Sequence, residues 1–250
     1  MTAFFDYPKS AAFGRVVPKN KIYEHAGANA ALKDLFVREV DQIVWSYKLA
    51  PETINLPATK TVIEIQVFRV SLKTTTLDRD VLRAIDRAVP FPLIFELTHN
   101  GRVKLAAAYK RPSEADSTRR VIGDYFETQW LANDTPRTPF PLALDMSSLY
   151  ERLLSPLVTA QTERLVPGMG EAPQAPFTAA PGVAPVSLEA RIALAEAIKA
   201  KARDIERIRA RIAREKQFNK RVAINAELRA AKQELEWLTA GDPFGAVTDK

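Results

Sequence analysis

The sequence predicts an α+β fold, in which a mixed or antiparallel sheet of about four strands carries packed helices and is followed by a long C-terminal helix. Three observations lead to this prediction. Residues 61–72 and 93–109 have the composition of strands, and amphipathic segments with helical spacing lie before, between and after them. Residues 187–240 contain neither Pro nor Gly and repeat apolar residues at helical spacing. Adjacent strands accompanied by helices are typical of a single α+β layer.

The first helix is predicted at residues 29–49, where apolar residues follow the i, i+3, i+4 spacing. Asn29 is placed to cap its N-terminus, and a proline ends it. Residues 61–72 come next and are rich in β-branched and aromatic side chains, which predicts a strand buried on much of both faces. Glu64 and Gln66 share one face of this strand, because successive side chains alternate.

A short amphipathic helix is predicted at residues 77–89, with two aspartates in the first turn, where the helix dipole favours carboxylates. Residues 93–109 are predicted to form a β-hairpin. The dipeptide Asn100-Gly101 at its centre tolerates positive φ at both central positions of a type I′ turn. A further strand is predicted at residues 125–131, and Asp145 is placed to cap the helix that follows.

The chain is predicted to divide into four parts. An α+β core occupies residues 1–165, a Pro/Ala-rich linker residues 166–186, a helical tail residues 187–240, and a disordered end residues 241–250. The linker is apolar mainly through Ala, which buries too little surface to offset the entropy cost of ordering the chain.

Two apolar seams run along the tail. In each seam, Ile or Leu side chains recur at heptad or half-heptad spacing, and the two seams are out of phase with each other. We expect the seams to contact a protein partner or a second copy of the chain. The seam residues are Ile198, Ile205, Ile208, Ile212, Ile224, Leu228, Leu235 and Leu238.

The polar segment at residues 215–220 separates the two seams. It is either a stutter in one continuous coiled coil or the bend of a helical hairpin. Because it contains neither Gly nor Pro, the sequence favours the continuous helix. Such a helix would be about 80 Å long at 1.5 Å per residue, too long for a domain of this size to bury.

Basic residues far outnumber acidic residues between positions 199 and 221. One interpretation is the solvated exterior of a coiled coil, and the other is a stripe that contacts phosphates with salt-dependent affinity. The candidate contacts with DNA or RNA are Arg203, Arg207, Arg209, Arg211, Arg214, Lys216 and Lys220.

The composition restricts the function classes. The 36 Lys and Arg residues exceed the 30 Asp and Glu residues, and the net charge of +6 mildly favours anionic partners. The absence of cysteine excludes disulfides and thiolate metal sites. The sequence contains no leader-like N-terminus and no apolar run of membrane-spanning length, which predicts a cytoplasmic protein without a membrane partner. No cofactor is expected.

The sequence lacks a P-loop, a dinucleotide fingerprint, a nucleophile elbow and a zinc-binding HExxH motif. One enzymatic alternative is a divergent metal-dependent nuclease similar to the PD-(D/E)XK class. In it, Glu64 and Asp41 would hold the ion and Lys73 would contact phosphate, although Gln66 stands where that class has a lysine. A buried, hydrogen-bonded Glu64–Gln66 pair is the structural alternative.

Residues 45–55 form another candidate contact surface. Trp45 and Lys48 project from a different side of the predicted helix than Tyr47, which lies on its apolar face. An exposed Trp beside a Lys would suit a protein or a nucleic-acid base. Trp45 and Tyr47 could equally belong to the core.

The segments WSYKLAPETINL, EIQVFRVSLK, IDRAVPFPLIFEL, VKLAAAYK and EKQFNKRVAINAELRAAKQELEWL resemble a bacterial family known as domain of unknown function 4391. The resemblance implies an α+β core with a helical tail, and an association with DNA methyltransferases and helicases of restriction or phage-defence systems. It implies no catalytic residues. The leading hypothesis is a non-catalytic accessory subunit of such an assembly, and the alternatives are the nuclease and a simple nucleic-acid-binding protein.

Overall fold

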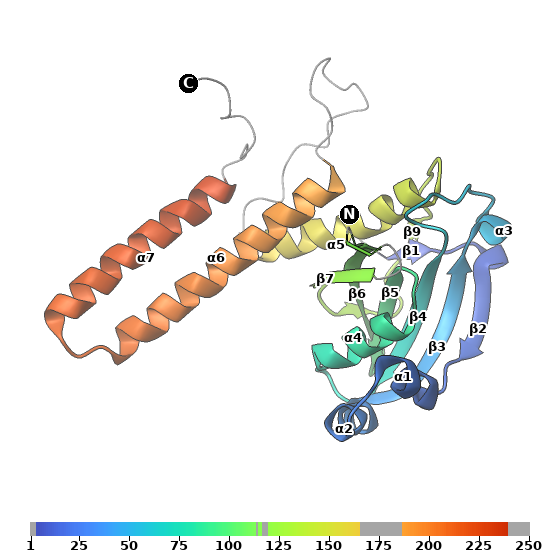
Figure 1. The fold of residues 1–250 in the computed structure, drawn as a ribbon, viewed down its shortest axis with the longest axis horizontal. Helices are drawn as coiled ribbons and strands as arrows, with labels where there is room; N and C mark the ends of the chain where they lie inside the picture. Colours follow the sequence, from blue (N-terminus) through green and yellow to red (C-terminus); the bar gives the residue numbers. More distant parts are fainter. Residues whose placement is uncertain (1–3, 114, 117–119, 166–186, 240–250) are drawn as a thin grey trace, which may run out of the picture. The chain divides into compact units, whose positions relative to one another are not determined.

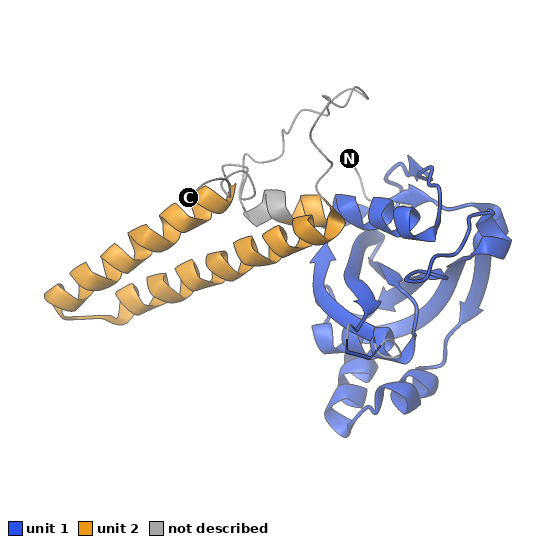
Figure 2. Cartoon of the chain, turned by 45° about the horizontal axis from the view of Figure 1, so that its top comes forward, with its two compact units in different colours: residues 1–157 blue, residues 158–250 orange. Residues whose placement is uncertain are grey.

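A computed structural model describes residues 4–113, 115–116, 120–165 and 187–239. The chain divides into two compact units, residues 1–157 and residues 158–250 (Figure 2). The predicted linker at residues 166–186 and the predicted disordered end lie outside the described residues. In the part of the chain that is described, no helix is long and apolar enough to cross a membrane.

Unit 1 contains a seven-stranded sheet in the order β2-β3-β4-β5-β6-β7, with β8 paired to β6 (Figure 1). Strands β4 and β5 are parallel, and the other pairs are antiparallel. The α+β class is confirmed, but the predicted number of about four strands is wrong. The strands are β2 Ala12–Val16, β3 Val40–Leu49, β4 Ile65–Leu72, β5 Leu93–His99, β6 Arg102–Pro112, β7 Arg120–Glu127 and β8 Leu131–Ala132.

One of the three additional strands lies in the predicted first helix. The structure has a helix α2 at Ala30–Glu39, whose N-cap Asn29 accepts a hydrogen bond from the Leu32 amide at 2.9 Å. Strand β3 follows at once. Its β-branched and aromatic residues happen to fit helical spacing, but pairing with β2 and β4 satisfies its backbone on both edges. Strand β2 is short and mostly exposed, so it lacks an apolar alternation that would have revealed it.

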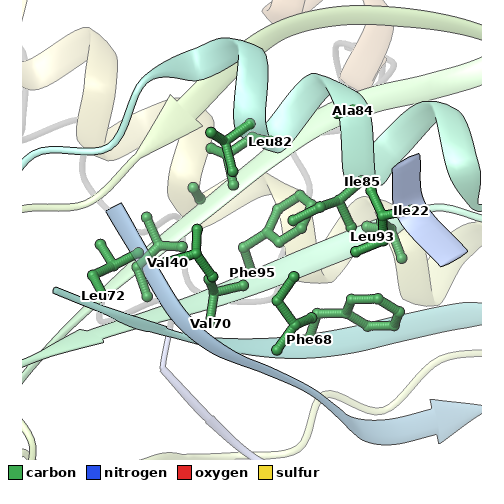
Figure 3. Packing of buried hydrophobic residues seen from close by; sticks show 14 of the residues in the cluster. Ile22, Val40, Phe68, Val70, Leu72, Leu82, Ala84, Ile85, Leu93 and Phe95 are labelled. Carbon is green, nitrogen blue, oxygen red and sulfur yellow. The ribbon is translucent and has the colours of Figure 1, made fainter. Parts of the chain in front are cut away.

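Three helices cover one face of the sheet (Figure 1). They are α1 Lys19–Ala26, α2, and α4 Arg79–Ala88. Phe68 of β4 and Phe95 of β5 are paired in register and face these helices, where Ile22 and Ile85 meet them (Figure 3). This apolar contact is the main core of unit 1.

The predicted local signals at the turn and the helix starts are confirmed. Asn100 and Gly101 have φ values of 45° and 71°, as a type I′ turn between β5 and β6 requires. Asp78 caps α4 by accepting from the Asp80 amide. Asp145 caps α5, Met146–Leu165, by accepting from the Ser148 amide at 2.7 Å. The buried residues on α5 include Met146, Leu149, Leu153 and Leu157.

Short elements complete unit 1. Strand β1 pairs in parallel with β9 as a separate two-stranded sheet, and a short helix α3 follows β3. Their bounds are β1 Phe5–Asp6, β9 Thr138–Pro139, α3 Pro51–Ile54 and the 3-10 helix η1 Lys9–Ala11.

A buried lysine holds the end of α4 to the sheet. Lys110 of β6 donates from Nζ to the carbonyl oxygens of Asp86, Val89 and Phe91 at 2.8–3.0 Å. Asp86 Oδ1 lies 2.7 Å from the same Nζ and forms a buried ion pair with it. The Tyr125 hydroxyl donates to Asp86 Oδ2. Burial lowers the pKa of Lys110 and raises the pKa of Asp86, while their mutual attraction opposes both shifts.

In unit 2, the tail is a helical hairpin. Helix α6 spans Leu188–Arg214 and helix α7 spans Phe218–Thr239, and the two helices pack against each other (Figures 1 and 2). The favoured prediction of one continuous helix is therefore wrong, and its alternative is correct. Three residues suffice for the bend: the amide of Glu215 closes α6, and its side chain accepts from the Gln217 amide at 2.8 Å.

We predict that Lys110→Met destabilises unit 1 by about 3–5 kcal/mol, because the carboxylate of Asp86 stays buried without its cation. Urea unfolding of the full chain measures this change. Replacing both partners, in Lys110→Met with Asp86→Leu, should recover most of the loss. Arg102→Met on the same strand is exposed and should stay within about 0.5 kcal/mol of the parent. A Lys110→Met variant as stable as the parent would contradict the role assigned to this lysine.

We also predict that cysteines introduced as Lys201→Cys and Glu234→Cys can be joined within one chain by a short bismaleimide, because these side chains form an ion pair across the hairpin. In a continuous helix the two positions would be about 50 Å apart. The parent chain has no cysteine, so the reagent has no other thiol target. The control pair Lys201→Cys with Arg214→Cys lies on α6 alone, about 20 Å apart, and should not be joined. Cross-links only between chains would contradict the hairpin.

Candidate interaction surfaces of the helical hairpin

The two predicted seams face each other inside the hairpin. Ile205 and Ile208 of α6 and Ala231 of α7 are buried together. Packed against them are Ile212, Ile224, Leu228 and Leu235. Ile198 is buried outside this cluster, and Leu238 is half-buried. Each seam is the other's partner, so most of the predicted partner-binding residues are covered within the chain.

A groove remains on the surface of the hairpin between the two helices. Its volume is about 470 Å³, and its floor is formed by Ile208, Ala230 and Ala231. Small alanine side chains on α7 leave this space unfilled opposite the larger residues of α6. The charged rim consists of Lys201, Asp204, Arg207, Arg211, Glu227 and Glu234. The sequence prediction did not include the groove, although the adjacent alanines Ala230 and Ala231 were its signal.

Ion pairs neutralise much of the charge along the helices. Lys201 pairs with Glu234 and Arg211 with Glu227, so both pairs bridge α6 to α7. The hydrogen bond from Lys201 to Glu234 raises the pKa of this lysine. Of the candidate phosphate contacts, Arg207 and Arg209 pair with Asp204 and Glu206 within α6. Exposed pairs of this kind contribute little stability, but they reduce the net charge that a phosphate would meet.

The other candidate phosphate contacts are arranged differently. Arg203, Arg214, Lys216 and Lys220 are exposed, and none has an acidic partner among the residues that the structure describes. Three of these four lie at the bend of the hairpin. Apart from Arg203 on α6, the structure thus separates the predicted basic stripe into an ion-paired length along the helices and an unpaired group at their joined ends.

In unit 1, the candidate nuclease residues are not brought together. Asp41 is at the start of β3, beside the end of β4 at Leu72, whereas Glu64 precedes the start of β4. These ends are roughly 23 Å apart at 3.3 Å per residue. Lys73 donates from Nζ to the Val37 carbonyl at 2.8 Å and so caps the end of α2. Across the described residues, no three His, Asp or Glu side chains are grouped to hold a metal ion.

Glu64 and Gln66 are buried next to each other. Gln66 Nε2 donates to Glu64 Oε1, and Lys48 Nζ lies 3.6 Å from Glu64 Oε2. Lys48 also bonds Glu52 at 2.5 Å; that bond, with the charge of Glu64, raises the pKa of Lys48. Both carboxylate oxygens of Glu64 and the amide nitrogen of Gln66 thus have partners. This is expected of a buried pair that stabilises the fold.

The aromatic residues of β3 belong to the packing of unit 1. Trp45 packs against Phe13 with ring centroids 4.1 Å apart and the ring planes tilted by 40°. It is half-buried, and its Nε1 donates to the Tyr47 carbonyl. Trp45 and Tyr47 do project to different sides, as predicted, but they do so from strand β3 and not from a helix. A register shift pairs Trp45 with Phe68 and Tyr47 with Val67, so the two rings lie on opposite faces of the sheet.

Two leucines on unit 1 stand out by their exposure. Leu142 and Leu144, in the segment before α5, are 89% and 88% exposed. Isolated exposed leucines are ordinary on protein surfaces, but a closely spaced pair this exposed offers apolar area to another molecule. The sequence analysis missed this pair, and no helical or strand periodicity marks it.

A family model described as a domain of unknown function (DUF4391) matches residues 5–235, which is nearly the whole chain. No curated protein and no solved structure gives a significant match. The match spans both units, so the hairpin is part of what the family shares and not an addition to unit 1.

We predict that Glu64→Ala lowers the stability of unit 1 by about 1–3 kcal/mol, because Gln66 Nε2 loses its buried acceptor. Thermal unfolding measures the change. The matched control is Glu52→Ala, which removes the other carboxylate that binds Lys48 but lies in solvent, and it should have little effect. If Glu64→Ala were neutral for stability and abolished a magnesium-dependent nuclease activity, Glu64 would be a catalytic residue instead.

Proposed function

We propose, from the premise that the chain belongs to the DUF4391 family, that it is a non-catalytic accessory subunit of a DNA-modification or phage-defence assembly. Unit 1 binds one protein component, and the α6–α7 hairpin binds another. The observation that carries this proposal is the groove on the hairpin, which combines an apolar floor with a charged rim.

The groove suits a helix of a partner protein. A two-helix hairpin leaves one side of each helix in water, and a third helix that packs between them completes a bundle. The exposed Ala230 and the buried Ala231 and Ile208 give a narrow apolar floor that a ridge of partner side chains can enter. The rim holds three basic and three acidic side chains, which favours a partner helix with charges of both signs.

Unit 1 offers a separate contact. Leu142 and Leu144 are exposed enough to insert into an apolar pocket of another subunit as a small anchor. Two contacts on one chain are what an adaptor needs, because each component can then be held without competing for the same surface.

We predict that Ala230→Trp weakens the complex with the partner subunit at least tenfold, because the indole fills the groove where the partner helix would lie. The chain would be co-expressed with a methyltransferase or helicase subunit of a restriction-type system, and the complex measured by size-exclusion chromatography and calorimetry. Ala223→Trp is the matched control. It lies one heptad earlier on the same face of α7 and does not line the groove.

Ala230 is exposed, so its replacement should leave the hairpin folded, which circular dichroism verifies. A complex that tolerates Ala230→Trp as well as Ala223→Trp would overturn the groove as the docking site. Failure of any such subunit to form a complex with the parent chain would overturn the adaptor role itself.

A further inference from the structure

The bend of the hairpin concentrates unpaired positive charge. Arg214 ends α6, Lys216 lies in the connecting loop, and Lys220 and Arg221 lie in the first turn of α7. These four residues, called the basic tip below, are all exposed. Within the described residues none of them has an acidic partner.

The only acid in this stretch is already engaged. Residues 214–221 contain the four basic residues and one acidic residue, Glu215. Its side chain is half-buried and accepts a hydrogen bond from the Gln217 amide, which holds it in the bend. Elsewhere on the hairpin the exposed basic residues have acids close in sequence. Arg229 and Lys232, for example, are interspersed with Glu227, Glu234 and Glu236.

The backbone adds to the positive potential. Helix α7 begins at the bend, and its first amides carry the positive end of the helix dipole. The opposite effect of the α6 C-terminus is reduced by Arg211 and Arg214, which lie in its last turn. The N-terminus of α7 therefore favours an anion at this end of the hairpin.

We propose that the basic tip binds the backbone phosphates of double-stranded nucleic acid. A duplex presents about one negative charge per 1.7 Å of its axis, so four cations grouped at one end of a hairpin can meet several phosphates at once. The contacts are with phosphates, so binding is independent of sequence and is lost as salt rises. This inference goes beyond the proposed adaptor function, because it requires only the chain itself and the polymer.

The test uses the purified full chain and a labelled DNA duplex of about 25 bp, with an RNA duplex of equal length as a second probe, read by fluorescence anisotropy. Four phosphate contacts give a slope of log K against log salt of about −3.6, or about a 10²-fold loss of affinity between 50 and 200 mM salt. The relative affinity for the two probes tells whether DNA or RNA is the source of the phosphates.

The decisive variant replaces the basic tip by Arg214→Gln, Lys216→Gln, Lys220→Gln and Arg221→Gln. It should bring the slope close to zero and abolish binding at about 150 mM salt. The matched control carries Lys9→Gln, Lys60→Gln, Arg229→Gln and Lys232→Gln. These residues are exposed and lie outside the bend, and the control loses the same net charge as the tip variant. It should keep a slope within about one unit of the parent.

Three results would overturn the proposal. One is equal loss of binding in the tip variant and the control, which would make net charge the cause. Another is a salt slope near zero in the parent chain. The last is tip-dependent binding to vesicles of anionic lipid, or to polyglutamate, that is as tight as binding to the duplex. A folded Ala230→Trp variant should still bind nucleic acid, so failure of the adaptor role and failure of this proposal are distinguishable.

Discussion

The functional interpretation of this chain depends on one packing contact, the closure of the apolar seam between α6 and α7. Ile205 and Ile208 on one helix meet Ala231 on the other, and the remaining Ile and Leu residues extend the contact along both helices. If the seam were open, it would be the obvious surface for a partner. Because the seam is closed, a partner must bind elsewhere on the hairpin. The candidate surfaces are the groove that Ala230 and Ala231 leave beside the seam, and the bend that brings two helix ends together.

Unit 1 depends on a different kind of contact. Its parallel pair, β4 and β5, needs a crossover through α4, and the end of that helix leaves carbonyl groups without partners. Lys110 reaches these carbonyls from β6, and Asp86 balances its charge. A buried ion pair adds little net stability compared with apolar packing, but its hydrogen bonds are satisfied in only one arrangement. We infer that this group fixes where α4 ends against the sheet, while the apolar cluster around Phe68 and Phe95 provides most of the stabilising burial.

The two units suggest a division of roles. In unit 1, these polar side chains stabilise the fold. Glu64 accepts a hydrogen bond from Gln66 and pairs with Lys48, and Lys73 caps the end of α2. The hairpin leaves apolar surface in a groove and charge at its bend. A molecule that connects other molecules needs more than one contact surface. The groove and the bend of the hairpin meet this need, which agrees with the proposed accessory role.

The sequence by itself determined what depends on neighbours along the chain. The Asn100-Gly101 turn, the caps at Asn29 and Asp145, and the apolar faces of the tail follow from backbone preferences and side-chain spacing that act within a few residues. Only the tertiary structure decided the rest. Residues 40–49 fit a helix by spacing and became a strand because β2 and β4 supply hydrogen bonds on both edges. The tail could have been one rod or two helices, since both forms have the same local pattern. The choice depends on which apolar faces meet, and packing between residues far apart in the chain settles that.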